Sequence, residues 1–490
     1  MTTAEQATAL LPRPGLLVGG EWLDRSTGGN WTHVNPATGR ATAEVPLAGP
    51  VEVDGAVAAA REAVPGWRAQ TPALRRDLLL RLAELMAAAG DELAALTSLE
   101  MGQPYRAARA GVAGAVEWFR YYAGWADKVD GVVAPVAPGV ALDYVVSEPY
   151  GVVAAIVPWN GPVISLALKV APALAAGNTV VLKPPELAPF SSLRFAALAS
   201  QAGLPAGVLN VIPGGAAAGE ALCRHPGVGK ISFTGGCDTG RAVAVAAAEH
   251  HTPVVLELGG KSASLVFADT DPATTGKLAA LLGVAQNSGQ GCFLPTRLLV
   301  ERPVYDAVVE RVTEVASGLR LGDPFDPATN MGPVVSESAC ARILAVIDTA
   351  ADTKAGRLCC GGRRAGGDLG DGFFVEPTVF ADADPASALV QDEIFGPVLA
   401  IAPFDTEEEA VGLANATRYG LAGYVWTDDL RRAHRVAAAL EAGYVSVNGM
   451  APLPPAAPFG GWKASGQGVE GGRAGIAEFL RPKNVFVSLR

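Results

Sequence analysis

From residue 151 onward, short apolar runs alternate with segments of helical periodicity, and this alternation restricts the fold more than any other feature of the chain. The expected strands are 151–157, 178–182, 208–212 and 230–233, and the expected helices are 163–176, 190–202, 216–224 and 239–249. The strands are apolar on both faces, and each is followed by a helix. Such a pattern predicts a parallel sheet that is covered by helices on both sides.

A second region with the same alternation runs from Ser262 to about Gly460. Its expected strands are Ala263–Phe267, Thr296–Val300, Val398–Pro403 and Tyr444–Val447. Ahead of both regions, amphipathic helices are expected at Val51–Arg68, Pro72–Met86, Asp91–Met101 and Ala110–Val129. The 490 residues contain no evident internal repeat or low-complexity linker, so two α/β domains are predicted.

Two further segments are typical of exposed β-structure. Between Gly131 and Tyr150, valines and a leucine alternate with turn residues, which indicates an extended hairpin. The last residues, Lys483–Leu489, alternate in the same way. Because a terminal strand needs an edge with which to pair, these two segments are expected to form a β-rich appendage.

The composition excludes some classes of function. The net charge is −11 and basic residues are spread along the chain, which argues against binding to nucleic acid or to a membrane surface. Six cysteines without a C-x-x-C pair and five histidines without ligand spacing predict neither a metal site nor a disulfide framework. No signal-peptide pattern is present, and no apolar stretch reaches the roughly 18 residues of a membrane span. A cytoplasmic location is therefore predicted.

Three residues indicate a reaction. Cys292 ends the glycine-rich run 287–292, Glu257 begins a Gly-Gly turn, and Asn160 follows the first strand of the sheet. A thiol can attack a carbonyl carbon, an amide can stabilise the resulting oxyanion, and a carboxylate can activate water. Each residue alone has an ordinary structural explanation, as a buried cysteine, a helix-capping carboxylate or a turn residue. Their combination favours catalysis, and the remaining five cysteines are expected to be structural.

Two signals indicate a bound nucleotide. Gly235 and Gly236 lie between a strand and a helix, where backbone N–H groups and the helix N-terminus can bind a pyrophosphate. Lys183 and Glu186 follow another strand of this sheet, at the edge where ligands bind. A carboxylate there can accept both ribose hydroxyls and would repel a 2′-phosphate, which favours NAD over NADP. The alternatives are a tight connection at the glycines and a surface ion pair between Lys183 and Glu186.

A series of short motifs extends over most of the chain. The motifs are Asn35-Pro36-Ala37-Thr38-Gly39, Pro158-Trp159-Asn160, Lys183-Pro184-Pro185-Glu186, Phe233-Thr234-Gly235-Gly236, Glu257-Leu258-Gly259-Gly260-Lys261, Gly289-Gln290-Gly291-Cys292, Glu376-Pro377-Thr378, Glu393-Ile394-Phe395-Gly396-Pro397, and Pro458-Phe459-Gly460-Gly461 with Lys463 and Ser465-Gly466. In identity and order they resemble the aldehyde dehydrogenase superfamily. The presence of Glu257 fits the branch that hydrolyses its acyl intermediate, because the base is typically absent where coenzyme A accepts the acyl group.

The resemblance implies an α/β fold with two Rossmann-like domains and a β-hairpin oligomerisation appendage. Residues 1–130 and 151–256 would form the dinucleotide-binding domain and 257–465 the catalytic domain. Residues 131–150 and 476–490 would form the oligomerisation segment, in which the hairpin pairs with the C-terminal strand of a neighbouring subunit. A homodimer or homotetramer is therefore expected, with a small-molecule aldehyde as substrate.

The resemblance also implies roles for individual residues. Cys292 is the expected nucleophile, Glu257 the general base for deacylation, and Asn160 with the Cys292 backbone N–H the oxyanion hole. Lys169 and Glu470 match positions that the family links to proton relay. The expected cofactor-binding residues are Ile156, Pro158, Trp159, Lys183, Glu186, Gly215, Gly219, Phe233, Thr234, Gly235, Gly236, Leu258, Glu393 and Phe395.

The substrate pocket is expected to be wide and apolar. Gly161 stands where many relatives carry an aromatic residue, and Leu168 where relatives that act on succinate semialdehyde carry Arg. The expected pocket residues are Gly161, Ser165, Leu168, Gly291, Phe293 and Leu453. Together they favour a medium or large aldehyde, aromatic or terpenoid-like, over acetaldehyde. Gly291 and Val469 depart from common family residues, so the reactivity and the C-terminal salt bridges are expected to differ from those of relatives.

Two other classes of protein remain as alternatives. A cysteine-dependent ester hydrolase would use Cys292 and Glu257 without a dinucleotide. A non-catalytic structural relative would normally lose one of these two residues, and both are present.

Overall fold

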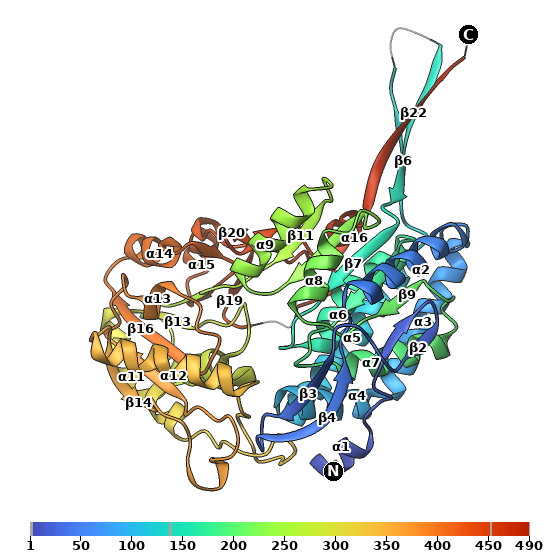
Figure 1. Ribbon diagram of the computed structural model, residues 1–490. Coiled ribbons are helices and arrows are strands. Elements are labelled where there is room, and N and C mark those ends of the chain that lie inside the picture. The colour runs from blue at the N-terminus through green and yellow to red at the C-terminus, as the bar shows by residue number, and fades with distance from the viewer. Residues whose placement is uncertain (1–2, 137–139, 451–452, 490) are drawn as a thin grey trace.

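The computed structural model describes residues 3–136, 140–450 and 453–489 and consists of two α/β halves with a protruding β-ribbon (Figure 1). Each half is built around its own parallel sheet, and the ribbon leaves the first half beside helix α16 (Gly472–Ala477). The predicted fold of two covered α/β sheets with a β-rich appendage is confirmed.

The first sheet has a Rossmann-like core of five parallel strands. They are β7 (Val152–Ile156), β8 (Thr179–Lys183), β9 (Leu209–Val211), β10 (Lys230–Thr234) and β11 (Val254–Glu257), in the spatial order β9-β8-β7-β10-β11. The connecting helices are α6 (Pro162–Ala175), α7 (Phe190–Ala202), α8 (Ala216–Cys223) and α9 (Cys237–Ala248). The order reverses between β7 and β10, so the carboxyl ends of these two strands border the crevice where such sheets bind ligands.

Alternate side chains of the central strand enter different cores. Val153 and Ala155 pack in the cluster under helices α3 (Pro72–Ala88), α4 (Gly90–Met101), α5 (Tyr105–Ala123), α6 and α7. Val152, Ala154 and Ile156 pack in a second cluster, under α2 (Pro50–Arg68), α8 and α9. Burial on both faces explains why the sequence run is continuously apolar. None of the described helices is long and apolar enough to cross a membrane.

The sequence patterns missed the N-terminal strands and misplaced one helix. The predicted helix Ala110–Val129 is α5, which begins earlier, at Tyr105, and ends at Ala123, because Gly124 and the turn after it replace the last predicted turn. The remaining N-terminal elements are α1 (Ala4–Ala9), β1 (Leu16–Val18), β2 (Glu21–Leu23), β3 (Asn30–Asn35) and β4 (Arg40–Pro46). Strands β1 and β2 extend the first sheet beyond β9 in antiparallel orientation, a position that short apolar runs do not reveal.

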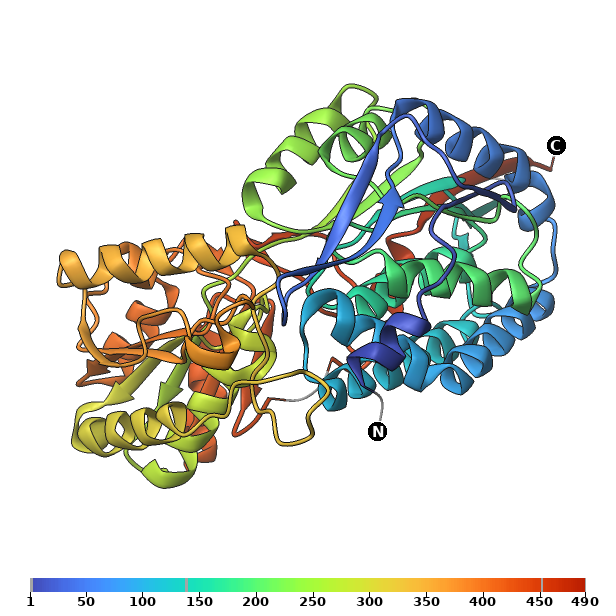
Figure 2. The same cartoon turned by 60° about the horizontal axis from the view of Figure 1, so that its bottom comes forward.

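The β3–β4 hairpin ties the two halves together. It lies along the first half and points its turn at the second (Figure 2). Phe373 N donates a hydrogen bond to Pro36 O at 2.9 Å, and Gly39 at the turn packs on the backbone of Asp371. Gly39 has φ +64°, so the turn needs a residue that tolerates the left-handed region.

The second sheet repeats the strand order of the first. Its parallel core consists of β12 (Ala263–Val266), β13 (Arg297–Glu301), β16 (Val398–Phe404), β18 (Ala422–Trp426) and β19 (Tyr444–Val447), in the order β16-β13-β12-β18-β19. Strands β15 (Thr378–Ala381) and β14 (Arg357–Cys360) complete one edge. The larger helices are α10 (Pro272–Ala280), α11 (Tyr305–Ser317), α12 (Glu337–Asp352), α14 (Glu407–Asn415) and α15 (Leu430–Ala439), with the short α13 (Ala388–Gln391) before β16. A two-residue strand, β21 (Gly466–Gln467), leads back to the first sheet and pairs with β11.

The third sheet is the protruding ribbon of β5 (Val132–Ala134), β6 (Ala141–Pro149) and β22 (Leu480–Ser488). Strand β22 pairs with β6 along its whole length, from Leu480 opposite Pro149 to Ser488 opposite Ala141. The pairing expected with a neighbouring subunit's C-terminal strand is therefore wrong for this chain: its own β22 occupies that edge. The chain turns back at α16, next to the start of the hairpin, so the local partner is within reach.

Candidate active site

The predicted nucleophile lies on a sharply turned loop between α10 and β13. Helix α10 continues into a π-helical turn, Leu281–Ala285, and then into a 3₁₀ turn at Gln286–Gly289. Three consecutive residues of the latter, Asn287, Ser288 and Gly289, have φ values of 50°, 54° and 70°. A Cβ atom on Gly289 would collide with the Gly396 carbonyl oxygen. The loop therefore stores backbone strain directly before Cys292, as reactive loops often do.

Asn160 contacts this loop from the first sheet. Its Nδ2 donates to the Gln290 carbonyl oxygen at 3.0 Å, and Asn287 Nδ2 donates to the same oxygen at 2.9 Å. Asn287 Nδ2 also lies 2.9 Å from Asn160 O. An amide has two N–H donors, so Asn160 retains one for a ligand. Folding thus brings the predicted oxyanion-hole amide to within two residues of the predicted nucleophile.

The Gln290 side chain holds the loop in place. Its Oε1 accepts from Val335 N at 2.9 Å, and its Nε2 donates to Asn287 O at 3.1 Å. Gln290 is 1% exposed, so these bonds are shielded from water. We recognised neither Asn287 nor Gln290 as important from the sequence, although Asn is a residue type that tolerates a left-handed backbone.

Glu257 ends β11 and is buried beside the thiol. It is 3% exposed, and neither carboxyl oxygen has a hydrogen-bond partner of normal geometry among the described residues. Burial, and then the charge of Glu470, raise its pKa well above the usual range; Lys169 and the Gly461 backbone oppose this without cancelling it. A raised pKa makes the carboxylate form of such a group a stronger base, which suits it to take up a proton in catalysis.

The surroundings of the Cys292 thiol disfavour its ionised form. Burial raises its pKa well above the usual range, and the charges of Glu393 and Glu257 raise it further. The residue as a whole is partly exposed, so a small ligand can approach it. Because the thiolate is the nucleophile, the site needs a base or a bound cation to ionise it.

Lys169 and Glu470 form a buried ion pair behind Glu257. Lys169 Nζ lies 2.7 Å from Glu470 Oε1 and 3.1 Å from Ser232 Oγ, and the lysine is completely buried. Lys169 comes from α6, whereas Glu470 is held by paired backbone bonds to Phe459. The charges of both residues act on Glu257, so the predicted relay residues and the predicted base form one electrostatic group.

Glu393 and Phe395 approach from the second half. Glu393 Oε1 accepts from Gly260 N at 3.1 Å, and its carboxyl group occupies the space that a side chain at Gly259 would fill. Burial raises its pKa to about 7. The Phe395 ring packs edge-on against Trp159, with 5.4 Å between ring centroids. Predicted cofactor-binding residues of the two halves therefore meet here.

The remaining predicted cofactor residues surround the carboxyl ends of β7, β8 and β10. Lys183 is buried, its aliphatic chain lies against Gly214 and Gly219, and the charge of Glu186 partly offsets the lowering of its pKa by burial. Helices α8 and α9 begin at Gly215 and Gly236 without side-chain caps, and nothing lies within 4 Å of a Cβ placed on either glycine. The free N–H groups and open space at two helix N-termini suit a pyrophosphate.

The other residues of this set shape the crevice. Leu258 packs against Gly240 of α9, and the Phe233 ring covers Gly235. Ile156 is buried, whereas Pro158 and Thr234 are half-buried at the ends of their strands. These contacts place apolar side chains at the strand ends, beside the N–H groups of the helix N-termini. Such a combination of apolar surface and N–H donors suits a dinucleotide.

The predicted substrate residues lie on two walls. Gly161 begins α6, where a Cβ atom would sit 3.0 Å from Ile164 and 3.8 Å from Ser165 Oγ. Leu168 is 7% exposed, and Leu453 packs against the same apolar cluster. Gly291 packs on Leu294, next to the nucleophile.

A row of four aromatic rings begins at Phe293, the residue after Cys292. Phe293 contacts Phe459, Phe459 contacts Tyr444, and Tyr444 contacts Tyr424, with 6.1 Å between ring centroids at each step. Only Phe293 was identified as a pocket residue from the sequence. The other three come from separate parts of the chain, so no local pattern connects them.

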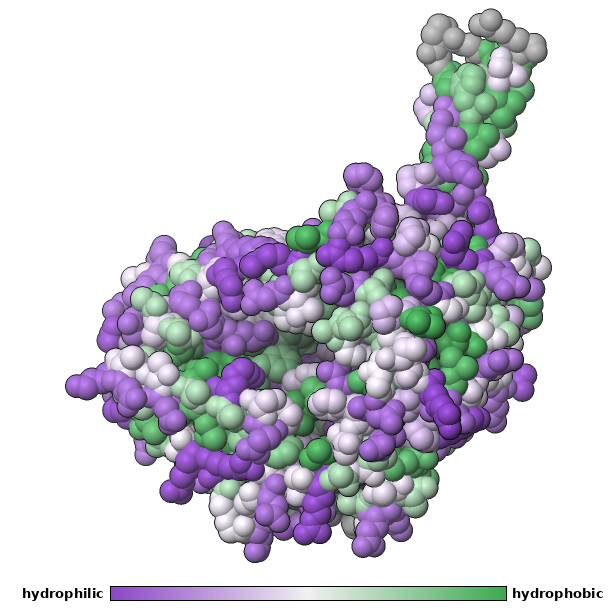
Figure 3. Space-filling model, viewed as in Figure 1, coloured by the Kyte–Doolittle hydropathy of each residue, from purple (hydrophilic) through white to green (hydrophobic). Residues whose placement is uncertain are grey.

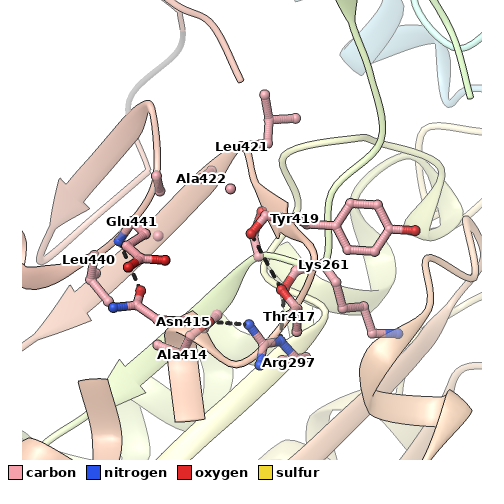
Figure 4. Close-up of a pocket in the computed structure, with 15 residues that line it drawn as sticks. Lys261, Arg297, Ala414, Asn415, Thr417, Tyr419, Leu421, Ala422, Leu440 and Glu441 are labelled. Carbon is pink, nitrogen blue, oxygen red and sulfur yellow. Dashed lines mark hydrogen bonds between the residues drawn. The ribbon is translucent and has the colours of Figure 1, made fainter. Parts of the chain in front are cut away.

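The molecular surface is hollowed between the two halves (Figure 3). A distinct small cavity of about 20 Å³ lies within the second half, lined by residues that include Arg297, Asn415 and Glu441 (Figure 4). It contains none of the predicted site residues, and its size suits roughly one water molecule rather than an aldehyde. Arg297 lines this cavity and donates hydrogen bonds to Lys261 O at 2.8 Å and to Ala414 O at 2.7 Å.

Lys261 links that region to the site electrostatically. Its Nζ is buried without a hydrogen-bond partner among the described residues, and in Figure 4 its side chain extends away from Asn415 and Glu441. Burial, with the charge of Arg297, lowers its pKa to about 7, against the opposing charge of Glu393. The sequence placed Lys261 in a motif but assigned it no function, because its partners are remote in the chain.

Comparisons with known proteins agree with this geometry. The family model described as the aldehyde dehydrogenase family matches residues 22–485. The betaine aldehyde dehydrogenase of Cereibacter sphaeroides is 40% identical over 480 residues, which are 98% of each chain. The phenylacetaldehyde dehydrogenase of Pseudomonas fluorescens is 41% identical over 483 residues, covering 96% of this chain and 95% of that protein.

A solved structure matches the fold closely. The betaine aldehyde dehydrogenase of Staphylococcus aureus, in complex with NAD+, superimposes with a TM-score of 0.97 at 34% identity. The match covers 99% of this chain and 97% of that one. Sheets, connecting helices and the ribbon are therefore shared over the whole length.

Proposed function

The chain belongs to the aldehyde dehydrogenase family, and from this premise we propose that it oxidises an aldehyde to the carboxylic acid with NAD as hydride acceptor. One observation carries the proposal furthest: the buried, unbonded carboxyl of Glu257 shares a site with the Cys292 thiol, next to a crevice with two uncapped helix N-termini. A thiol, a base and a dinucleotide-shaped crevice are the parts that this reaction needs.

In the first step, the Cys292 sulfur attacks the aldehyde carbon and the carbonyl oxygen becomes an oxyanion. Asn160 Nδ2 and the Cys292 backbone N–H donate hydrogen bonds to that oxygen; losing one such donor typically costs about 3–4 kcal/mol of transition-state stabilisation. Glu257, whose pKa is raised by burial, takes the thiol proton directly or through a water molecule.

NAD, when bound, supplies the acceptor for the hydride that leaves the aldehyde carbon. Loss of the hydride leaves the carbon bound to Cys292 as a thioester. Once Glu257 has given up the thiol proton, it removes a proton from water, the water oxygen attacks the thioester carbon, and the C–S bond breaks to release the acid. Lys169 and Glu470 adjoin Glu257 and provide a route by which its proton reaches solvent.

The crevice residues favour NAD over NADP. Glu186, beside Lys183, can accept the hydroxyls of an adenosine ribose and would repel a 2′-phosphate. The helix N-termini at Gly215 and Gly236 would hold the pyrophosphate, and Glu393 the nicotinamide ribose. The S. aureus relative was solved with NAD+, which supports the same choice here.

For the substrate, we propose a medium or large aldehyde with an apolar, preferably aromatic, group. Gly161 leaves one wall without a bulky side chain, and the partly exposed Phe293 and Tyr444 of the aromatic row form the other. Phenyl rings pack well edge-on against such rings. The P. fluorescens relative is named for phenylacetaldehyde, which supports this class.

The aromatic row also favours a second candidate. A quaternary ammonium group is attracted to ring faces, and the C. sphaeroides relative is named for betaine aldehyde. The two candidates separate in a direct comparison of kcat/KM for phenylacetaldehyde, betaine aldehyde and acetaldehyde. We expect phenylacetaldehyde to be preferred; a preference for betaine aldehyde would select the second candidate.

Formation of NADH, followed by its absorbance, tests the reaction itself. The wild-type protein is expected to reduce NAD with an aldehyde, and Cys292→Ala is expected to abolish this. Ester cleavage without any binding of NAD would instead support a thiol hydrolase. Gly161→Phe tests the pocket: unchanged selectivity between benzaldehyde and acetaldehyde would contradict the assigned wall.

We further propose that the ribbon mediates a homodimer or homotetramer. Val132, Val133, Val140 and Phe486 are each at least 60% exposed on it, an unusual amount of apolar surface for a protruding element. Sedimentation of the intact protein and of a Phe486→Glu variant measures whether the apolar surface of the ribbon holds the subunits together. A cytoplasmic location stays a prediction.

A further inference from the structure

Tyr424 donates a hydrogen bond to the residue that follows the nucleophile. Its hydroxyl lies 2.7 Å from the Phe293 carbonyl oxygen. Tyr424 stands in the middle of β18, which lies between β12 and β19 in the second sheet, and is completely buried. The donor therefore belongs to one of the most rigid parts of the fold, whereas the acceptor belongs to a loop.

The nucleophile loop is fixed on the other side as well. Upstream of Cys292, the Gln290 carbonyl accepts two hydrogen bonds, from Asn160 and Asn287. The Cys292 carbonyl itself packs against Gly260 so closely that a Cβ atom there would overlap it. Downstream, the Tyr424 hydroxyl is the side-chain donor to the Phe293 carbonyl. Hydrogen bonds therefore hold the chain on both sides of Cys292. Asn160 of the first half bonds the loop upstream, and Tyr424 of the second half bonds it downstream.

We propose that Tyr424 is a positioning residue, whose hydroxyl fixes the carbonyl of Phe293, the residue after Cys292, and thereby restricts the directions of the sulfur and of the Cys292 N–H. The assignment rests on the proposed function insofar as Cys292 is the nucleophile. Because Phe293 adjoins Cys292 in the chain, a shift of the loop at Phe293 moves both the attacking atom and an oxyanion donor. Misplacement by about 1 Å can cost roughly 100-fold in rate, so even a partial effect of losing this hydrogen bond is measurable.

The surroundings of Tyr424 agree with this assignment. Burial first, and then the charges of Tyr444 and Cys292, raise its pKa far above the usual range, so it remains a donor throughout the working pH range. The influence of Cys292 on Tyr424 independently indicates that the hydroxyl and the thiol are near each other. Without the Tyr424 hydroxyl, the Phe293 carbonyl loses the hydrogen bond that ties the loop to β18.

The Tyr424→Phe variant removes the hydroxyl and keeps the ring. We expect kcat to fall about tenfold while KM for NAD stays unchanged, because the cofactor crevice lies elsewhere. Independently of turnover, the rate of Cys292 alkylation by iodoacetamide, measured across pH without aldehyde or NAD, is expected to fall by a similar factor. Cys292→Ala identifies the labelled residue by mass spectrometry. Tyr424→Met, which fills the space without a donor, repeats the test should the phenylalanine variant not fold.

Tyr305→Phe is the matched control. Tyr305 lies on α11, is also buried, and donates to Asp382 Oδ1 at 3.0 Å, away from the nucleophile loop. Both variants are expected to lose some thermal stability, but only Tyr424→Phe should change kcat and the alkylation profile. Wild-type values of both in Tyr424→Phe would overturn the proposal. Slowed alkylation in a protein that oxidises no aldehyde would uphold the positioning and reject the proposed function.

Discussion

Two buried carboxyl groups in the first half of the molecule have opposite surroundings. Glu100, at the end of α4, is completely buried and accepts hydrogen bonds from Phe190 N at 2.7 Å, Ser191 N at 3.3 Å and the Ser191 hydroxyl. Glu257 is almost as buried, yet neither of its oxygens has a partner of normal geometry among the described residues. Burial is the first cause of a raised pKa in both.

The difference shows that burial alone does not make a carboxyl group reactive. Glu100 caps the N-terminus of α7, where free N–H groups and the helix dipole favour a carboxylate. The carboxyl oxygens of Glu100 therefore accept hydrogen bonds that hold the start of α7 in place. Glu257 faces Glu470, Lys169 and the Cys292 thiol instead, so its acceptor capacity remains available for a proton.

The strongest test of this comparison is Glu257→Gln. An amide cannot act as a general base, so we expect kcat to fall by about 100-fold or more. The NADH burst and the steady-state phase should both slow, because Glu257 takes the thiol proton before hydride transfer and activates water after it. Stopped-flow absorbance measures both phases.

Glu100→Gln is the control for that experiment. It makes the same chemical change at an equally buried position, and kcat is expected to stay within about twofold of wild type. Equal loss of activity in the two variants would mean that burial of an amide, rather than loss of a base, explains the effect.

The pH profile sharpens the comparison further. Because the pKa of Glu257 is raised, the rate of deacylation should climb with pH over a range above that of an ordinary glutamate. Single-turnover measurements of thioester hydrolysis locate the rise. A profile with its rise near pH 4.5 would show that Glu257 is not the titrating base.

Glu100→Gln should affect stability rather than rate. Replacing one carboxylate oxygen by an NH₂ group leaves backbone donors at the start of α7 without an acceptor, at a cost of about 1–3 kcal/mol. Urea unfolding, monitored by tryptophan fluorescence, measures this difference. An unchanged unfolding midpoint would show that α7 does not depend on its buried cap.

The smallest expected effect is on the pH dependence of stability. Burial raises the pKa of Glu100 to about 7, so the folded protein holds this proton more tightly than the unfolded chain. The contribution of Glu100 is then complete below about pH 4.5 and declines as the pH rises to about 7. The wild-type protein should lose stability over this interval relative to Glu100→Gln, and parallel curves would contradict the raised pKa.

Much of the architecture was predictable because it depends on patterns within short segments of the sequence. Doubly buried strands such as Val152–Ile156 are continuously apolar, and turn motifs such as Gly235–Gly236 follow them directly. Edge strands gave weaker signals: β1 and β2 are only three residues each, and their pairing with β9 depends on a remote partner. The pairing partner of β22 was wrong for the same reason, since alternation predicts a strand but not its neighbour.

The candidate site was predictable only in its chemically distinctive residues. Cys292, Glu257 and Asn160 stand in recognisable motifs, and contacts in the structure connect their segments. Tyr424, Tyr444 and Lys261 were missed as functional residues, because a tyrosine in an apolar strand or a lysine after two glycines looks the same whether or not it faces a reactive group.

The amino-acid sequence by itself determined the two alternating α/β regions, the appendage and the choice of Cys292 as the proposed nucleophile, because periodicity and residue chemistry are properties of short segments. Only the tertiary structure decided which groups act on that thiol. The Tyr424 hydroxyl, the unbonded Glu257 carboxyl and the Lys169–Glu470 pair come from distant segments. Their distances, burial and mutual charges exist only once both sheets have formed.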